Sequence, residues 1–159
     1  MESRKSPSRR TNSHQVASEG RSLVESELRK RGAGLVTSEG RRKIYLRASS
    51  ADRSRTVQIQ VKTKTKGNWQ TTIDEAQVIE TPPNPQDERN FWIFVDLTGT
   101  RRYWIAPDSW VRKNIREAHH EYLNKHGGRR ARNDASNHHS IDEKRLERWQ
   151  DRWDVLSIF

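Results

Sequence analysis

The sequence predicts an α/β fold, with a mixed sheet of about five strands flanked by helices and with further helices toward the C-terminal end. Three segments carry this prediction. An apolar stripe at helical spacing runs through residues 18–31, apolar and polar residues alternate over Thr56–Lys64, and a nearly continuous apolar run covers residues 91–97. Because helical and strand patterns interleave along a chain of only 159 residues, we expect one domain.

The N-terminal part begins with a basic stretch and continues into a helix. Residues 1–15 lack apolar periodicity and are rich in Arg, Lys and Ser, which favours a disordered basic arm. In residues 18–31, Val24 and Leu28 share one side of the predicted helix. Gly32 follows the last turn, where a left-handed residue commonly ends a helix.

Three short strands are expected next and should pair as a meander. The first two are predicted over residues 33–37 and 43–48, on either side of a turn. The third strand, Thr56–Lys64, has two chemically different faces. Its apolar face is expected in the core and carries Val57, Ile59 and Val61, whereas its polar face carries Gln58, Gln60, Lys62 and Lys64. Such amide and ammonium groups can hold a phosphate or a water, or can form an ordinary solvated face.

The middle of the chain predicts a short helix, a loop and a hairpin. A capping box at Thr72-Ile73-Asp74-Glu75 predicts a helix to about Ile79. The proline-rich residues 81–88 predict a loop, because proline interrupts helices and central strands. Residues 91–97 and 102–106 then predict a hairpin with a buried first strand.

Two helices are predicted at the C-terminal end. The first starts at Asp108 or Ser109 and ends at Gly127-Gly128. The second opens with a capping box at Ser140, and its apolar face consists of Leu146, Trp149 and Trp153. We expect residues 107–159 to form a helical part packed on the same domain as the α/β core, residues 16–106.

Composition favours a polyanionic partner. The chain carries a formal net charge of +10 at pH 7, with 33% charged and 30% hydrophobic residues. No basic amphipathic helix or long apolar run is visible, so nucleic acid is expected ahead of a membrane. The absence of cysteine excludes disulfides and thiolate metal sites, and no signal peptide is visible, so we expect a cytoplasmic protein.

The strand containing Gln60-Val61-Lys62, preceded by the helix that ends at Gly32, resembles the PD-(D/E)xK nuclease superfamily, which has a restriction-endonuclease-like fold. It is most similar to small bacterial members in which glutamine replaces the glutamate of the E-x-K half-motif. The similarity extends over residues 20–94. It implies Mg²⁺ held by carboxylates from the helix and two strands, with the lysine assisting attack of water on a phosphodiester.

The acidic positions of that motif depart from the family pattern. Arg21 stands where the small relatives often have glutamate, and Lys43 stands where aspartate is expected, so that only Gln60 and Lys62 match. A cation about 4 Å from a metal site opposes a positive ion by roughly 4 kcal/mol per unit charge at an effective dielectric constant near 20. We therefore expect a degenerate metal site, with no certain cofactor, in which Arg21, Lys43 and Lys62 bind phosphate.

Two alternatives remain open. The chain could be an active Mg²⁺-dependent endonuclease in phage defence or repair, with Gln60, Lys62 and Glu25 as catalytic residues and a carboxylate from a loop completing the site. It could instead be a basic protein-interaction subunit with an acidic partner. The paired histidines His119-His120 and His138-His139 suggest an HNH or zinc site, but no metal-ligand spacing accompanies them.

The leading hypothesis is a nucleic-acid-binding protein, with DNA as the expected ligand and a homodimer or a larger defence complex as the assembly that the resemblance allows. The phosphate-binding candidates are basic residues on the first helix, the strands and one loop: Arg21, Lys43, Lys62, Lys64, Lys66, Arg129, Arg130 and Arg132. Phosphate contacts of this kind position a nucleic acid without reading its sequence.

Overall fold

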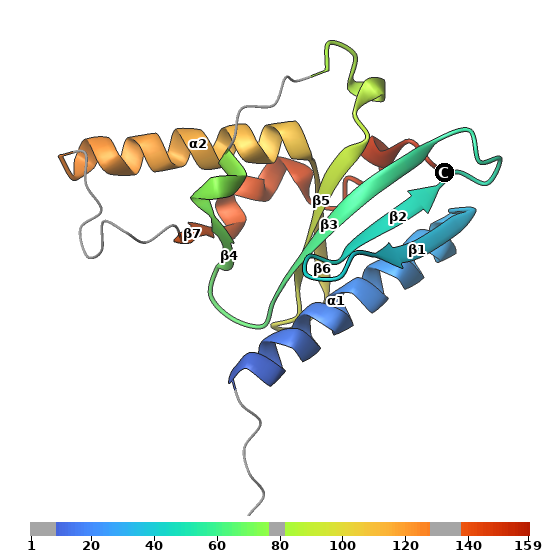
Figure 1. Cartoon of the computed structure of the whole chain (residues 1–159), viewed down its shortest axis with the longest axis horizontal. Helices are drawn as coiled ribbons and strands as arrows, with labels where there is room; N and C mark the ends of the chain where they lie inside the picture. Colours follow the sequence, from blue (N-terminus) through green and yellow to red (C-terminus); the bar gives the residue numbers. More distant parts are fainter. Residues whose placement is uncertain (1–8, 77–81, 128–137) are drawn as a thin grey trace, which may run out of the picture.

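The computed structural model describes residues 9–76, 82–127 and 138–159 (Figure 1). The helices are α1 (Arg9–Arg31) and α2 (Asp108–Lys125), and short 3₁₀ segments are η1 (Ile73–Ala76), η2 (Pro85–Asp87), η3 (Glu143–Trp149) and η4 (Trp153–Leu156). The strands are β1 (Leu35–Glu39), β2 (Tyr45–Ser49), β3 (Thr56–Lys64), β4 (Trp69–Thr72), β5 (Asn90–Asp96), β6 (Arg102–Pro107) and β7 (His138–Ile141).

The main sheet is mixed and has five strands in the order β1-β2-β3-β5-β6. Strands β1, β2 and β3 form an antiparallel meander, β5 runs parallel to β3, and β6 returns antiparallel to β5. The predicted α/β class with a mixed sheet of five strands is therefore confirmed. Strands β4 and β7 form a separate two-stranded sheet.

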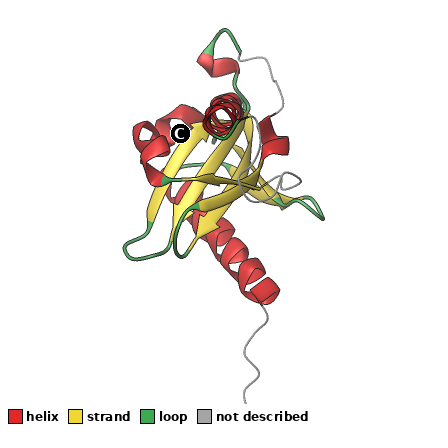
Figure 2. Ribbon diagram, turned by 90° about the vertical axis from the view of Figure 1, so that its left-hand side faces the viewer, coloured by secondary structure: helices red, strands yellow, loops and turns green. Residues whose placement is uncertain are grey.

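The sheet separates two hydrophobic cores. On one face, Val24 and Leu28 of α1 pack with Val57 and Ile59 of β3. On the other face, Trp92 of β5 and its aromatic neighbours pack beneath α2 and the β4–β7 sheet. Figure 2, which looks nearly along α2, shows the two helices at opposite sides of the twisted sheet.

A glycine allows α1 to approach β3 closely. Gly20 lies on the buried side of the helix, one turn before Val24. A Cβ atom placed on Gly20 would lie 1.8 Å from Oγ1 of Thr63 and 2.8 Å from its Cβ, so no larger residue fits without movement of the helix or the strand. This contact fixes the height of α1 over the sheet.

The first helix is longer than the sequence pattern predicts. It begins at Arg9 instead of residue 18, so residues 9–15 of the expected disordered arm are helical, while residues 1–8 lie outside the described part. In the extension, Val16 and Ala17 are partly buried and line a pocket together with the connection between β3 and β4. In the described ranges, no helix combines the length and the apolar composition that crossing a bilayer requires.

The boundaries of the first strands shift for a local reason. Gly32 has a φ of 111° and follows the last helical residue, as predicted. The amide of Ala33 donates to the carbonyl of Leu28 at 3.0 Å, so this residue still belongs to the helix end. Strand β1 consequently begins at Leu35 instead of residue 33, whereas β3 has the bounds that the alternation predicted.

The segment after β3 differs from the prediction. Trp69–Thr72 is a strand, β4, which the pattern did not indicate, and the expected helix is reduced to η1 over Ile73–Ala76. The remainder of that predicted helix, residues 77–79, lies outside the described part. Trp69 is buried and donates from Nε1 to the carbonyl of Val95 at 3.0 Å, so it belongs to the core.

The C-terminal residues do not form the single helix that was predicted. The chain forms β7, then η3 and η4, with a bridge between Gln150 and Trp104 of β6 separating the two 3₁₀ segments. Trp149 packs in the core beneath α2, whereas Trp153 packs in the core beneath α1, 5.3 Å from the ring of Tyr103. The prediction of one helix from this spacing was wrong because the chain crosses the edge of the sheet between the two tryptophans.

Candidate functional site

The polar face of β3 is the most distinctive surface of the sheet. Its even-numbered residues point away from α1, because their odd-numbered neighbours Val57 and Ile59 are buried in the α1 core. The layer formed by α2 covers β5 and β6 on that side, where Trp92 is fully buried. Gln58, by contrast, is exposed, and so the face is open over β2 and β3.

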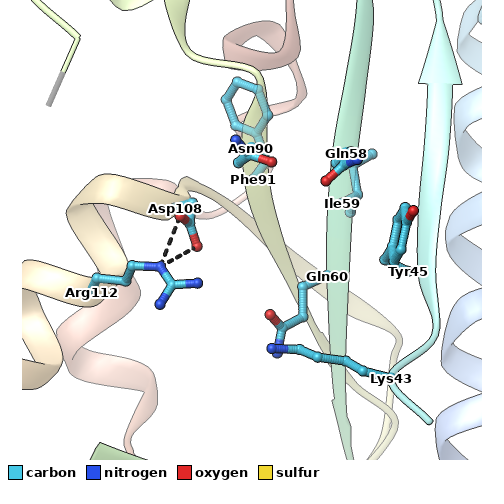
Figure 3. Close-up of a pocket in the computed structure, with 9 residues that line it drawn as sticks. All are labelled: Lys43, Tyr45, Gln58, Ile59, Gln60, Asn90, Phe91, Asp108 and Arg112. Carbon is cyan, nitrogen blue, oxygen red and sulfur yellow. Dashed lines mark hydrogen bonds and ion pairs between the residues drawn. The ribbon is translucent and has the colours of Figure 1, made fainter. Parts of the chain in front are cut away.

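A groove runs along this open face between the sheet and the start of α2. A pocket of about 390 Å³ is lined by Lys43, Tyr45, Gln58, Ile59, Gln60, Asn90, Phe91, Asp108 and Arg112 (Figure 3). A second hollow, lined by Arg47, Thr56 and Arg89, shares Gln58 and Asn90 with the first. We call this continuous surface the β3 groove. Four cations line it, Lys43, Arg47, Arg89 and Arg112, together with the carboxylate of Asp108.

A network of ion pairs forms one wall of the β3 groove. Arg112 of α2 contacts Asp108 at 2.9 Å and Glu75 of η1 at 3.2 Å. Glu75 also accepts a hydrogen bond from Nζ of Lys43 at 2.6 Å. The second carboxylate of the network, that of Asp108, accepts a hydrogen bond from Nε1 of Trp92 at 2.6 Å, which connects the network to the core.

Lys62 lies on the same strand face, next to this network. Its ammonium group is 5.9 Å from the centre of the Trp92 ring. Burial lowers the pKa of Lys62, Glu75 acts in the opposite direction, and the charge of Lys43 lowers the pKa further. A phosphate entering the groove would favour the charged form of Lys62 and would supply the counter-charge that its surroundings provide only in part.

The residues do not fit the magnesium site that the family resemblance implies. In residues 9–76, 82–127 and 138–159, no three His, Cys, Asp or Glu side chains gather where they could hold a metal ion. Glu75, whose charge acts on Lys62, and Asp108, which lines the groove with Gln60, are both engaged by the guanidinium of Arg112. Hard divalent cations require free oxygen ligands, so this arrangement favours an anion over a cation.

The predicted site residues separate into two groups. Gln60 and Lys43 line the β3 groove, and Lys62 lies beside it. Arg21 and Glu25 belong to α1, which packs on the opposite face of the sheet, and neither lines the groove. Glu25 instead lies 3.6 Å from Arg29 of the same helix. The expected convergence of Arg21 with Lys43 and Lys62 is therefore not found.

The remaining predicted cations lie elsewhere. Lys64 is directed toward the aromatic core, since its Nζ is 4.4 Å from the centre of the Trp69 ring and 3.8 Å from Asp96. Lys66 is exposed and lines a different pocket, next to the N-terminal turns of α1. The basic loop that carries Arg129, Arg130 and Arg132 lies outside the described residues.

Sequence reasoning missed the acids and arginines of the groove. Glu75 was interpreted as a capping-box residue and Asp108 as a helix cap, so neither was assigned to a site. Arg47 alternates with the buried Leu46 and Ala48 on β2, which would have placed it on the open face. No local pattern indicates Arg89 or Arg112, because their place in the groove depends on how distant elements pack.

Comparison with known proteins yields no match: no protein-family model, no curated protein and no solved structure is similar to the chain. The assignment of a function therefore starts from the chemistry of the β3 groove and from the charge of the chain.

Proposed function

We propose that the chain binds nucleic acid, with DNA as the expected ligand, by placing a phosphate backbone in the β3 groove. The observation that carries this proposal is the composition of the groove, in which four cations and three side-chain amides line one continuous hollow. Arginines and lysines bind phosphate, and amides can donate hydrogen bonds to phosphate and sugar oxygens.

Charge supports the same assignment. The groove lies on a protein with a net charge of +10, which attracts polyanions over a distance of about a Debye length, roughly 8–10 Å at physiological salt. Part of the positive charge in the groove is offset by acids, because Lys43 pairs with Glu75 and Arg47 lies 3.6 Å from Glu39. A phosphate would compete with these acids for the cations, which predicts moderate affinity and a strong dependence on salt.

The scaffold that we propose is a PD-(D/E)xK nuclease-like fold with a degenerate metal site. Its support is the helix followed by a meander of three strands, with Gln60 and Lys62 on the third strand, at the positions that the resemblance assigned to them. Lys43, at the position expected to be acidic, forms an ion pair with Glu75. Under this proposal the ancestral metal position has become part of an anion-binding surface.

Fluorescence anisotropy with labelled duplex DNA, single-stranded DNA and RNA tests the proposal. Each phosphate contact contributes about 0.9 to the slope of log affinity against log salt on duplex DNA, so it changes the ratio of affinities at 50 and 200 mM salt by about 3.5-fold. Arg47→Ala should reduce the slope by about one contact. Arg116→Ala, which removes an exposed cation of α2 outside the groove, is the matched control and should have no such effect.

Two results would contradict the proposal. One is the absence of nucleic-acid binding at 50 mM salt, which would favour an acidic protein as the partner. The other is an equal loss of slope for Arg47→Ala and Arg116→Ala, because net charge alone would then explain the binding.

A further inference from the structure

A cavity outside the β3 groove lies next to the residues that lead into β5. It has a volume of about 520 Å³ and is enclosed by the start of α2, the proline-rich segment before β5, and η3 and η4. This volume lies within the range of roughly 300–1,000 Å³ that is typical of small-molecule sites. We call it the C-terminal cavity.

Two tryptophans supply the aromatic wall of the C-terminal cavity. Trp110 and Trp149 both line it, with ring centres 5.5 Å apart and planes at 68°. Trp149 is buried in the core, whereas Trp110 is only partly buried. The edge contact with Trp149 therefore holds Trp110 in place and leaves part of its indole ring available to a ligand.

Cations surround this aromatic wall. Lys113, Arg148 and Arg152 line the cavity, and all three are exposed. The guanidinium groups of Arg148 and Arg152 lie 4.6 and 5.8 Å from the centre of the Trp149 ring, which positions them at the wall. Arg152 is also paired with Asp154, so Arg148 is the more available anion-binding group.

Two carboxyl groups line the cavity, those of Glu88 and Asp154, and Asp154 is paired with Arg152 at 2.9 Å. Glu88 lines the wall and accepts a hydrogen bond from Oγ of Ser109 at 3.2 Å. Burial raises the pKa of Glu88, so proton uptake at this group is easier than in water. The wall thus carries three cations, Lys113, Arg148 and Arg152, against two carboxyl groups.

We propose that the C-terminal cavity binds a nucleotide, with the base stacked on Trp110 and the phosphate held by Arg148 and its neighbouring cations. A flat aromatic ring joined to an anion matches both features of the wall. The ligand can be a free mononucleotide or the terminal nucleotide of a strand. The cavity and the β3 groove meet at Phe91, which lines both, but their charged side chains differ: Asp108 and Arg112 line the groove, whereas Glu88 and Arg148 line the cavity.

Calorimetric titration of the full chain with the four ribonucleoside monophosphates tests this site. Mononucleotides should bind more tightly than adenosine or inorganic phosphate, which each satisfy only one part of the wall. Loss of one base–aromatic stack weakens binding by about 5- to 150-fold, so Trp110→Ala should reduce affinity within that range. Arg148→Ala should also weaken mononucleotide binding while leaving adenosine binding unchanged.

Control variants keep the test decisive. Trp110→Phe retains a stacking ring and should retain most of the affinity even if Trp110→Ala loses stability. Arg47→Ala in the β3 groove should leave mononucleotide binding unchanged, which separates failure of this site from failure of the groove. Absence of mononucleotide binding, or binding unchanged by both Trp110→Ala and Arg148→Ala, would overturn the proposal.

Competition identifies the source of the nucleotide. If a strand end is the ligand, single-stranded DNA should displace a bound mononucleotide, and removing the terminal base should prevent displacement. If the ligand is a free mononucleotide, single-stranded DNA should not compete. Both results support the site and differ only in its natural occupant.

Discussion

Neutralising Glu75 should make the protein less stable and its binding to DNA tighter. In the structure, the carboxylate of Glu75 is 2.6 Å from Nζ of Lys43 and 3.2 Å from a guanidinium nitrogen of Arg112. Glu75→Gln keeps a hydrogen-bond acceptor of the same shape and removes the charge. Lys43 then loses its acid partner, whereas Arg112 keeps its pair with Asp108 at 2.9 Å.

The expected sizes follow from exposure. The Lys43 side chain is 58% exposed, so its pair with Glu75 contributes about 0–1 kcal/mol to stability. Arg112 and Glu75 are 19% and 18% exposed, and a partly buried charged hydrogen bond contributes about 1.5–3 kcal/mol to stability. The amide oxygen introduced by Glu75→Gln still accepts a hydrogen bond and preserves part of this contribution. We therefore expect a loss of about 1–3 kcal/mol in the free energy of unfolding, measured by urea denaturation.

The effect on binding should have the opposite sign. One freed cation, Lys43, adds about 0.9 to the slope of log affinity against log salt on duplex DNA and lowers the dissociation constant at 50 mM salt. Anisotropy titrations over 50–200 mM salt measure both quantities. Glu121→Gln is the matched control, because it makes the same change in net charge on the exposed side of α2, outside the groove.

Three outcomes would refute this reasoning. Equal changes in Glu75→Gln and Glu121→Gln would show that net charge alone acts. Weaker binding in Glu75→Gln would show that Glu75 positions the cations and does not mask them. Cleavage of plasmid DNA by the wild type in Mg²⁺ or Mn²⁺, lost in Glu75→Gln and in Lys62→Ala, would favour the active-nuclease alternative.

Further predictions concern stability. Gly20→Ala should lower the free energy of unfolding by about 1–3 kcal/mol despite the helix preference of alanine, because its Cβ would overlap Thr63. Thr63→Ala in the same chain should restore part of the loss. Unchanged thermal denaturation of Gly20→Ala would contradict the close contact. Lys62→Met should raise the free energy of unfolding at pH 7 and weaken DNA binding. Burial lowers the pKa of Lys62, so the stability that this group contributes is present above its unfolded pKa and lost as the pH falls through its folded pKa. Glu88→Gln should make stability fall more steeply toward acid pH, because the raised pKa of Glu88 gives stability that is present below its unfolded pKa and is lost as the pH rises through its folded pKa. An unaltered curve measured by urea denaturation at pH 4–7 would contradict this role.

Local sequence patterns determined several elements of this protein. The alternation over Thr56–Lys64 predicted the bounds of β3 and the separation of its two faces, since a strand repeats every two residues whatever surrounds it. Gly32 predicted the end of α1, because a left-handed residue is a property of the backbone at one position. Net charge and the Gln60–Lys62 pair also indicated an anionic partner.

Only the tertiary structure decided which residues meet. Lys43 and Glu75 are 32 positions apart in the chain, and Arg112 reaches Glu75 from a third element. Their meeting depends on the packing of η1 and α2 against the sheet, which no periodicity encodes. The same reason explains Trp149 and Trp153, whose helical spacing is real but whose side chains enter two different cores because the chain crosses the edge of β6 between them.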